Sequence, residues 1–331
     1  MLIVHDKVYI IAEIGINHEG DVEKCRRMID LAAESGADAV KLQTIDADLN
    51  YVQGTQSYKV FKKAELTRNE TTAMFQYAQD IGVDIFTTCG DFPTAKWVNE
   101  LNPVAWKVSS GLLTHIPMVR YLASFGRHML ISTGMATIDE IDQAVSVVEE
   151  QGNDITIFQC TSLYPAPPES LNLASMTFLK ERYGHKVGFS DHSIGDDAAF
   201  LSVAAGATTI EKHFTFDSHR QGFDHGISLE PSNFKEMVKK VKLAKEMLGV
   251  VDKTIVKDVF NKRDKTLRVI VTNQYIRKGE GFTLENISIK RPIDGNNGII
   301  PANFSKVIDC IATRDIKMNT TIADSDFMID K

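Results

Sequence analysis

The chain has 331 residues, of which 43% are hydrophobic and 24% are charged, and this composition is ordinary for a globular protein with a sizeable core. Its formal net charge of -7 gives no general attraction to nucleic acid or to an anionic membrane surface. No apolar run approaches the roughly 20 residues of a membrane-spanning helix, and residues 1–6 lack the features of a secretory signal. Four widely spaced cysteines without a CxxC pair favour a reducing, cytoplasmic location: Cys25, Cys89, Cys160 and Cys310.

Eight short β-branched runs alternate with longer amphipathic segments, and most of these runs are continuously apolar, as strands covered on both faces are. The predicted strands are Val8–Glu13, Ala39–Gln43, Ile85–Thr88, Trp106–Ser109, Met129–Thr133, Ile155–Thr161, Val187–Ser190 and Thr208–His213. Predicted helices between and after them include Val22–Glu34, Asn69–Ile81, Ile138–Glu150, Ser170–Tyr183 and Pro231–Leu248. An open doubly wound sheet would need a glycine-rich turn after its first strand, which this chain lacks. The pattern therefore predicts a (β/α)8 TIM barrel.

The sequence pattern changes after Leu248. Residues 250–267 are rich in lysine and arginine and are interpreted as a linker between a catalytic barrel, residues 1–249, and a small module, residues 268–331. This module has short strand and turn patterns, and Tyr275–Ile287 resembles Asp315–Phe327 as a weak internal repeat. The fold class predicted for the whole chain is therefore α/β, a TIM barrel followed by a small β-rich domain with pseudo-symmetry.

The predicted strands end in unusually polar residues. Active sites of such barrels form at the C-terminal ends of the strands, and a buried charge is costly unless it has a partner. Lys41 and Lys107 bring two cations to this end, which suits a ligand with a phosphate and a carboxylate. Hydroxyl donors expected around them are Thr88, Ser110, Ser132 and Ser190. The alternative is that each lysine snorkels to solvent or pairs locally with an acid.

His192 and His213 end the seventh and eighth predicted strands, which are neighbours in a closed barrel. Two imidazoles at this position predict a weak, open site for a divalent metal ion that acts as a Lewis acid. A single histidine would more often be a packed residue. Asp224 follows the eighth strand in a loop that either folds over the mouth or stays a solvated turn, and the proline-stiffened run Cys160–Pro168 holds Tyr164.

Several of these strand ends carry sequence motifs of a known family. The chain resembles the sialic acid synthases, which condense phosphoenolpyruvate with an amino sugar to form nonulosonic acids, and the module resembles the antifreeze-like or SAF domain. The motifs are IIAEIGINHEG (Ile10–Gly20), ADAVKLQT (Ala37–Thr44), ISTGM (Ile131–Met135), CTSLYPAPP (Cys160–Pro168), GFSDHS (Gly188–Ser193), IEKHFT (Ile210–Thr215), DHGISLEP (Asp224–Pro231) and KRPIDGNNGIIP (Lys290–Pro301).

The resemblance implies that phosphoenolpyruvate, an N-acetylated hexosamine and water give a nine-carbon 2-keto acid and phosphate. It implies that His192 and His213 hold Mn²⁺, with Mg²⁺ or Co²⁺ as alternatives, and that Glu13 is a candidate for proton transfer. The residues implied for phosphoenolpyruvate are Lys41, Thr88, Lys107, Ser110, Ser132, Ser162 and Ser190. Those implied for the sugar are Gln43, Tyr164, Asp224 and, from the partner subunit of a domain-swapped homodimer, Arg291.

Two departures from the family pattern concern the sugar. Leu112 stands where sialic acid synthases carry an acid, and Cys89-Gly90-Asp91 replaces a common proline–aromatic pair. The acceptor is therefore left open between N-acetylmannosamine, a di-N-acetylated trideoxyhexose and a spore-coat-type sugar. Two other functions are also left open. One is a synthase that acts on a different sugar or a sugar phosphate, and the other is a non-catalytic carbohydrate-binding protein.

Overall fold

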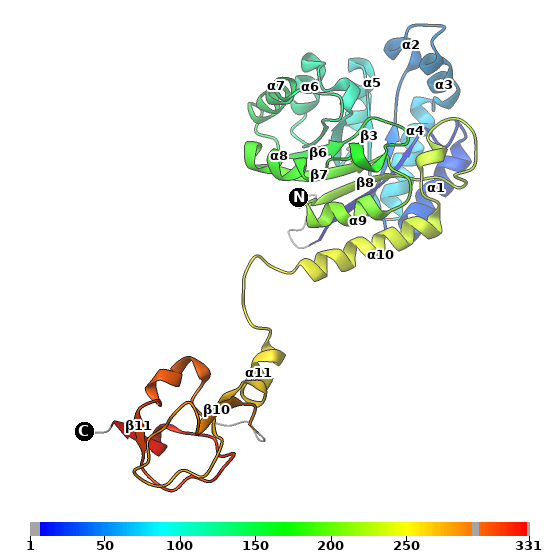
Figure 1. Ribbon diagram of the computed structural model, residues 1–331. Coiled ribbons are helices and arrows are strands. Elements are labelled where there is room, and N and C mark those ends of the chain that lie inside the picture. The colour runs from blue at the N-terminus through cyan, green and yellow to red at the C-terminus, as the bar shows by residue number, and fades with distance from the viewer. Residues whose placement is uncertain (1–6, 293–297, 330–331) are drawn as a thin grey trace. The chain divides into compact units, whose positions relative to one another are not determined.

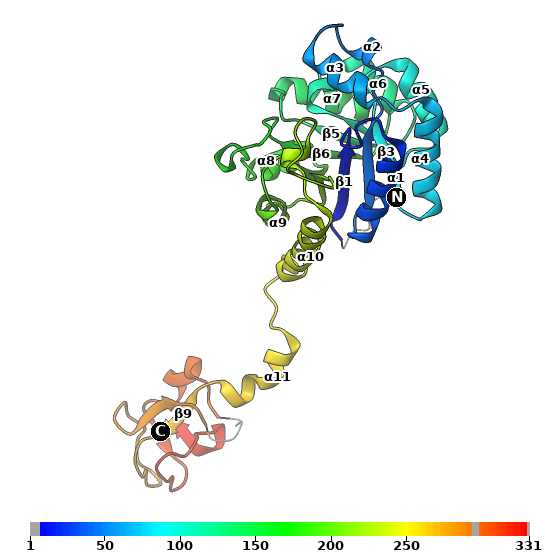
Figure 2. The same cartoon turned by 90° about the vertical axis from the view of Figure 1, so that its right-hand side faces the viewer.

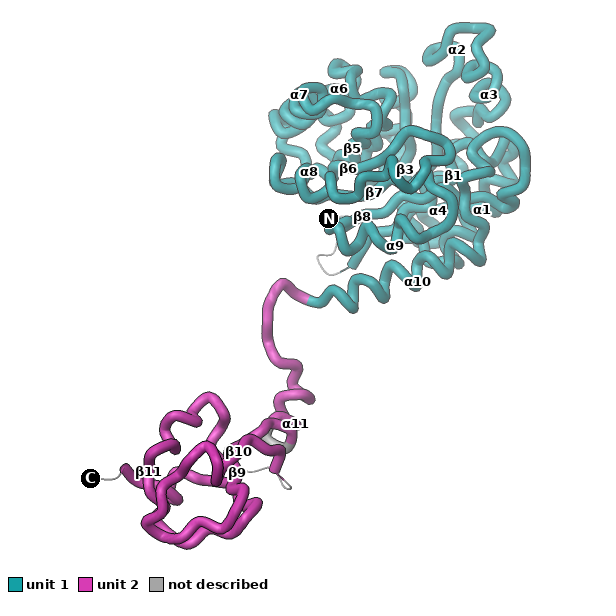
Figure 3. The backbone as a smooth tube through the Cα atoms, viewed as in Figure 1, with its two compact units in different colours: residues 1–249 teal, residues 250–331 magenta. Residues whose placement is uncertain are grey.

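The computed structural model describes residues 7–292 and 298–329. The predicted lack of a secretory signal concerns residues 1–6, which lie outside the described residues, as do residues 293–297 within the SAF-like motif. The chain divides into two compact units, Met1–Gly249 and Val250–Lys331, which Figure 3 colours separately. Among the described residues, no helix combines the length and the apolar character that crossing a membrane requires.

The first unit is a closed barrel of eight parallel strands in sequence order, as predicted, with helices around it (Figures 1 and 2). The strands are β1 Tyr9–Gly15, β2 Ala39–Gln43, β3 Asp84–Thr88, β4 Ala105–Val108, β5 His128–Ser132, β6 Ile155–Cys160, β7 Lys186–Asp191 and β8 Thr209–His213. The helices are α1 Val22–Glu34, α2 Ala47–Asn50, α3 Gln56–Ala64, α4 Arg68–Asp80, α5 Phe92–Glu100, α6 Ile116–Ala123, α7 Ile138–Glu149, α8 Ser175–Tyr183, α9 Asp197–Ala204 and α10 Pro231–Leu248.

Side-chain caps mark the starts of several helices. Thr67 and Thr137 form capping boxes at the starts of α4 and α7, and each accepts a hydrogen bond from the backbone three residues on. The predicted helix Ser170–Tyr183 is wrong at its start, because α8 begins only at Ser175. Asn172 has a positive φ of 42°, which a right-handed helix does not allow, so the segment before α8 is a separate short turn.

Two layers of side chains inside the barrel underlie the site. Six apolar residues form a buried cluster inside the sheet: Ile11, Ala39, Phe86, Ala105, Leu130 and Phe158. Residues two apart on a strand face the same side, so the next inward positions are Glu13, Lys41, Thr88, Lys107, Ser132 and Cys160. The apolar layer therefore closes the barrel, and the mostly polar layer above it forms the floor of a site at the C-terminal ends of the strands.

A buried ion pair ties the ends of β7 and β8 together. Lys212 and Asp191 are both fully buried, and the Lys212 Nζ lies 2.9 Å from the Asp191 Oδ2 and 2.6 Å from the backbone oxygen of Ser193. The Asp191 Oδ1 also accepts hydrogen bonds from the backbone N–H and the hydroxyl of Ser193. The pair thus fixes the backbone on either side of His192.

We expect Lys212→Met to lower the free energy of unfolding by about 3–5 kcal/mol, because it leaves the Asp191 carboxylate buried without its cation. The matched control is Lys239→Met, which breaks an exposed pair with Glu236 and is expected to cost less than about 1 kcal/mol. Denaturant unfolding of both variants measures the difference. Equal effects would mean that the buried pair has no structural role.

The second unit contains α11 Lys257–Thr266 and two small antiparallel sheets, β9 Val269–Thr272 with β10 Ile287–Lys290 and β11 Cys310–Ala312 with β12 Phe327–Ile329. The predicted linker of residues 250–267 thus contains a helix, α11, which the sequence analysis did not predict. Although this segment is highly charged, it has no proline or glycine, and Asp258 precedes Lys262 by four residues, a spacing that supports a helix.

The two predicted repeats of the second unit pair with each other. Ile276 and Ile316, at equivalent positions, exchange backbone hydrogen bonds and are both fully buried. Three residues further on, Gly279 and Asn319 each have a positive φ, of 83° and 61°, so both copies make the same kind of turn with the residue types that tolerate it. The internal repeat seen in the sequence is therefore also a structural repeat.

Candidate active site

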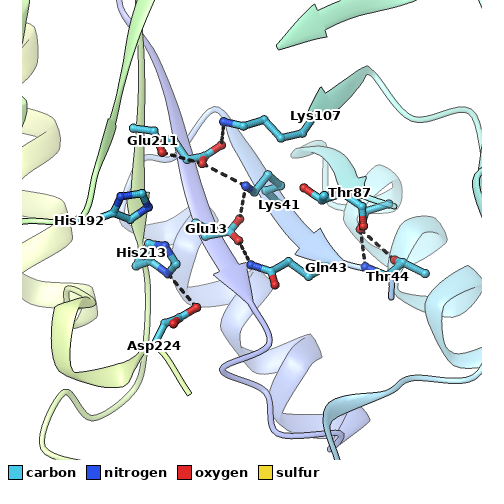
Figure 4. A network of polar contacts seen from close by, with 12 residues as sticks. Glu13, Lys41, Gln43, Thr44, Thr87, Lys107, His192, Glu211, His213 and Asp224 are labelled. Carbon is cyan, nitrogen blue, oxygen red and sulfur yellow. Dashed lines mark hydrogen bonds and ion pairs between the residues drawn. The ribbon is translucent and has the colours of Figure 1, made fainter. Parts of the chain in front are cut away.

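A cavity of about 420 Å³ opens at the C-terminal ends of the barrel strands. It is lined by all of the predicted site residues except Asp224 and Arg291: Glu13, Lys41, Gln43, Thr88, Lys107, Ser110, Ser132, Ser162, Tyr164, Ser190, His192 and His213. The two lysines and the two histidines thus share one cavity (Figure 4). The barrel brings them together because Lys41 and Lys107 lie in the C-terminal halves of β2 and β4, His192 directly follows β7 and His213 ends β8.

Both lysines are buried and paired with carboxylates. The Lys41 Nζ lies 3.1 Å from the Glu13 Oε2 and 3.0 Å from the Glu211 Oε1, and the Lys107 Nζ lies 2.8 Å from the Glu211 Oε2 (Figure 4). Lys107 also lies 4.1 Å above the centroid of the Phe158 ring. The lysines therefore point into the cavity and pair with acids at the same time. Glu211 was not among the predicted site residues, although it lies on a strand end.

The pKa values show how these charges depend on one another. Burial lowers the pKa of Lys41, but Glu13 and Glu211 more than compensate and raise it overall. Burial likewise opposes ionisation of Glu211, yet Lys107 and Lys41 hold its pKa well below its usual range. Glu13 behaves differently, since burial, with the charge of Glu211, raises its pKa to about 7 despite Lys41. Glu13 is thus the carboxyl of this group that exchanges a proton near neutral pH.

Glu13 gives a prediction for the pH dependence of stability. Its pKa in the fold is above the value of an unfolded chain, so folding favours the protonated form, and the folded state is penalised as pH rises from about 4.5 to about 7. We expect the free energy of unfolding of the wild type to fall by about 3 kcal/mol over this pH range relative to that of Glu13→Gln, whose glutamine side chain does not titrate. Chemical denaturation at a series of pH values measures this free energy for both proteins. Parallel plots of the free energy of unfolding against pH would contradict the prediction.

Two hydroxyls in the cavity are buried without a hydrogen-bond partner among the described residues, Thr88 Oγ1 and Ser132 Oγ. Each hydroxyl is therefore available to donate a hydrogen bond to a ligand in the cavity. Ser190 donates to Glu211 at 3.1 Å, and the Ser110 hydroxyl oxygen accepts from the backbone N–H of Gly134 at 3.0 Å. These hydroxyls line the same cavity as the two lysines, and their role as donors to a ligand stays a prediction.

Gly134 is a site residue that sequence reasoning missed, although it lies in the ISTGM motif. A Cβ atom at this position would lie 2.6 Å from the Cys160 Sγ and 2.7 Å from the Ser162 Oγ. Only glycine therefore lets the strand ends of β5 and β6 approach closely enough to place the Ser110 and Ser162 hydroxyls in the cavity.

The two histidines lie side by side, with ring centroids 5.3 Å apart. The His192 Nδ1 is 2.9 Å from the backbone oxygen of Thr161 and must donate to it, which leaves a lone pair on Nε2, 3.1 Å from the Tyr164 hydroxyl. The His213 Nδ1 is buried without a hydrogen-bond partner among the described residues, and the Asp224 Oδ2 lies 3.6 Å away. Burial lowers the pKa of both rings, so they are neutral at pH 7, the form that binds metal ions.

The described residues contain no group of three or more His, Cys, Asp or Glu side chains arranged to hold a metal ion. A metal ion held by His192 and His213 stays a prediction, and it would take its remaining ligands from water or substrate oxygens. The orphaned His213 nitrogen and the fixed tautomer of His192 both fit such an ion.

The loop after β8 brings Asp224 to the histidines, and Asn17 holds it there. The Asn17 amide accepts from the backbone N–H of Asp224 at 3.0 Å and donates to the backbone oxygen of Phe214 and the hydroxyl of Ser228. Burial raises the pKa of the Asp224 carboxyl to about 6. Arg291 is exposed and follows β10 in the second unit, so its contact with a sugar stays a prediction.

Comparisons with known proteins agree on one family. Residues 28–253 match the profile of the NeuB family. The N,N'-diacetyllegionaminic acid synthase of Campylobacter jejuni is 32% identical to this chain, with 96% of this chain and 99% of the relative covered. The N-acetylneuraminate-9-phosphate synthase of Mus musculus is also 32% identical, with 85% and 82% covered.

A solved structure agrees with these matches. The N-acetylneuraminic acid synthetase of Leptospira borgpetersenii, in complex with citrate, superimposes with a TM-score of 0.76 at 31% identity, over 78% of this chain and 90% of that one. The barrel and these matches define a phosphoenolpyruvate-dependent synthase of the transferase class, which favours an enzyme over a non-catalytic carbohydrate-binding protein. The chain belongs to the NeuB family.

Proposed function

We propose that this protein condenses phosphoenolpyruvate with an N-acetylated hexosamine and water, and releases a nine-carbon, sialic-acid-type 2-keto acid and phosphate. The observation that carries the proposal is the single cavity shared by two buried lysines and two neutral histidines. The two lysines suit an anion with two acidic groups, and the two histidines suit a metal ion that activates a carbonyl oxygen.

Phosphoenolpyruvate would lie against Lys41 and Lys107. Its phosphate and carboxylate would replace part of the contact that the lysines make with Glu211, and the free hydroxyls of Thr88 and Ser132 would donate to its oxygens. Ser110, Ser162 and Ser190 line the same cavity and are the other hydroxyl donors proposed for phosphoenolpyruvate. Thr88, Ser132 and Ser190 are buried in the cavity, so their hydroxyls would stabilise the charge that develops on the leaving phosphate in a site with little water.

His192 and His213 would hold the divalent ion, for which Mn²⁺ is proposed, with Mg²⁺ or Co²⁺ as alternatives. When bound, the ion supplies a Lewis acid for the aldehyde oxygen of the open-chain sugar. The residues fit it because the His213 Nδ1 has no hydrogen-bond partner among the described residues and the hydrogen bond to the Thr161 oxygen fixes the His192 tautomer.

In the proposed reaction, carbon 3 of phosphoenolpyruvate attacks the aldehyde carbon and forms the new C–C bond. Water then adds to carbon 2, and the resulting tetrahedral intermediate expels phosphate by breaking the bond between carbon 2 and the phosphate ester oxygen. Glu13, with its pKa near 7, lies next to Lys41 and accepts a hydrogen bond of 2.7 Å from the Gln43 amide. It is our candidate to take the proton from the attacking water.

The sugar would contact Gln43, Tyr164 and Asp224 in one subunit and Arg291 of the partner subunit of a domain-swapped homodimer. On this proposal, Arg291→Ala raises the KM of the sugar about 10-fold or more and changes the KM of phosphoenolpyruvate little, since a hydrogen bond from a charged group contributes about 1.5–3 kcal/mol. Steady-state kinetics with each substrate varied in turn measures both constants. Equal increases would mean that Arg291 does not reach the sugar.

A phosphorylated acceptor is the second candidate, because the mouse relative is named as a 9-phosphate synthase. A second phosphate needs its own cationic partner, and among the described residues the cavity lining includes no arginine and no lysine besides Lys41 and Lys107. The geometry therefore favours an unphosphorylated sugar.

The function is tested by incubating the purified protein with phosphoenolpyruvate, Mn²⁺ and a panel of acceptor sugars, and by measuring released phosphate and the mass of the product. The proposal expects phosphate and a nine-carbon keto acid in equal amounts with at least one N-acetylated hexosamine. Turnover only with phosphorylated sugars would favour the second candidate. No phosphate release with any sugar would overturn both.

A further inference from the structure

We propose that Glu19 is a positioning residue for the acceptor end of the site, because it holds the loop that carries Asp224. This loop comprises residues 214–230, between β8 and α10, and we call it the β8 loop. The inference rests on the proposed function, which assigns a sugar contact to Asp224. Glu19 is not part of the cavity lining, so it acts on the sugar only through the β8 loop.

One oxygen of the Glu19 carboxylate joins two residues of the β8 loop. The Glu19 Oε1 lies 2.6 Å from the Arg220 Nη2 and 3.2 Å from the His225 Nε2. Arg220 precedes Asp224 by four residues, and His225 follows it directly. The loop after β1 therefore binds the β8 loop on both sides of Asp224.

The hydrogen bonds of His225 make Glu19 its required partner. His225 is 1% exposed, and burial lowers the pKa of its ring, which is therefore neutral at pH 7 and carries one proton. A carboxylate only accepts hydrogen bonds, so this proton is on Nε2, and Nδ1 accepts from the Thr215 hydroxyl at 2.7 Å. Without Glu19, the buried Nε2–H would lose its acceptor, which favours movement of the β8 loop.

These three side chains do not form a second catalytic centre. Thr215, His225 and Glu19 place a hydroxyl, an imidazole and a carboxylate in the order that serine hydrolases use. Thr215 is also 1% exposed, however, and neither Thr215 nor His225 lines the cavity, so a substrate there does not reach this hydroxyl. The arrangement therefore serves the position of the β8 loop.

The position of Asp224 depends on these attachments. Its Oδ2 lies 3.6 Å from the His213 Nδ1 (Figure 4), and its backbone N–H donates to the Asn17 Oδ1 at 3.0 Å. A chain held by one hydrogen bond can still rotate about it, whereas the two contacts of Glu19 fix its direction as well. An error of about 1 Å in the position of a group that orients a substrate can cost about 100-fold in rate.

The backbone of Glu19 gives independent support. Its φ is 58°, in the left-handed region that glycine and asparagine tolerate and that a glutamate seldom adopts. Residues held in such a conformation depend on contacts that offset the strain, and they occur often at functional sites. The side-chain contacts are those with Arg220 and His225 and a longer one of 3.6 Å to the Lys24 Nζ.

The strained φ supplies a variant that separates position from stability. Glu19→Gly relieves the backbone strain and removes both contacts with the β8 loop. We expect it to lower kcat/KM for the sugar at least about 10-fold and to change the KM of phosphoenolpyruvate less than about 3-fold. Steady-state kinetics uses phosphoenolpyruvate, Mn²⁺ and the acceptor with the highest turnover in the sugar panel.

Two further variants act as controls for this result. Lys24→Ala removes the partner of the same carboxylate that lies on α1 and not on the β8 loop, so it should leave both constants within about 3-fold of the wild type. Glu19→Gln keeps an oxygen that can accept from His225, so it should lose less kcat/KM than Glu19→Gly does.

A double variant tests whether Glu19 acts through Asp224. If it does, adding Glu19→Gly to Asp224→Ala should lower kcat/KM for the sugar less than about 3-fold further, because the positioned carboxylate is already gone. The same loss with and without Asp224 would overturn the inference, since Glu19 would then act independently of Asp224. Equal effects of Glu19→Gly on the sugar and on phosphoenolpyruvate would also overturn it.

Hydrogen exchange tests the loop without any substrate. Backbone amides of residues 217–228 should exchange at least about 10-fold faster in Glu19→Gly than in the wild type, while those of the barrel strands and of Lys24→Ala stay unchanged. Equal exchange of this segment in Glu19→Gly and the wild type would overturn the inference, whether or not the protein is active. Faster exchange in a protein that turns over no sugar would support the role of Glu19 in holding the loop and overturn the proposed function alone.

Discussion

Exchange of His213 for alanine is expected to lower kcat at least about 1,000-fold, which corresponds to about 4 kcal/mol of transition-state stabilisation. The Nδ1 of this ring is buried without a partner among the described residues, and the ring faces His192 at 5.3 Å, so its loss removes one of two proposed ligands of the ion. Added Mn²⁺ at ordinary concentrations should not rescue the variant. Chelator should likewise abolish turnover of the wild type, and Mn²⁺ should restore it.

His185→Ala is the matched control, because His185 lies outside the cavity and contacts Glu149 at the surface. It should keep kcat within about 3-fold of the wild type. Binding of Mn²⁺ to each protein, followed by electron paramagnetic resonance, separates loss of the ion from loss of folding. Full activity of the wild type in excess chelator would show that turnover needs no metal ion.

Lys107→Met is expected to raise the KM of phosphoenolpyruvate about 100-fold or more and to change the KM of the sugar less than about 3-fold. A buried charge pair that loses one partner costs about 2–5 kcal/mol of binding, and Lys107 is 1% exposed. Steady-state kinetics with each substrate varied in turn measures the two constants. Equal increases would show that Lys107 does not act on phosphoenolpyruvate in particular.

The Lys107→Met protein leaves the Glu211 carboxylate with Lys41 as its remaining cation, and this can lower stability. The double variant Lys107→Met/Glu211→Gln removes the uncompensated carboxylate and should unfold at a higher denaturant concentration than the single variant. If the double variant is folded but binds phosphoenolpyruvate as well as the wild type does, Lys107 is a structural residue.

The eight strands were predictable because most of them are continuous apolar runs, a pattern that strands covered on both faces require. The site was predictable for the same reason, since polar residues such as Lys41 and His213 stand out against these runs. Because barrel sites lie at the C-terminal strand ends, residues at those ends are expected to share one cavity. The pairing of Lys41 and Lys107 with Glu211 was not predictable, because it depends on side-chain directions across the barrel.

Contacts between loops were harder to predict than the strand ends. Asn50 packs so closely against Gly90 that a Cβ atom there would lie 1.8 Å from the Asn50 Oδ1, and nothing in the sequence pattern indicates this contact between residues far apart in the chain. The start of α8 was missed because a positive φ at Asn172, which asparagine tolerates but does not require, interrupts an otherwise helical pattern. Helix α11 was missed because a highly charged segment without apolar periodicity resembles a linker.

The central claim is that phosphoenolpyruvate and a histidine-bound ion occupy the same cavity, and paramagnetic relaxation of bound phosphoenolpyruvate tests it most directly. Mn²⁺ shortens the ³¹P relaxation time of a phosphate with the inverse sixth power of the distance, and a cavity of about 420 Å³ leaves little room between the two. The account predicts strong relaxation in the wild type, and its loss in a His192→Ala/His213→Ala variant that still binds phosphoenolpyruvate. Bound phosphoenolpyruvate whose ³¹P relaxation is unchanged by Mn²⁺ that the protein also binds would contradict it.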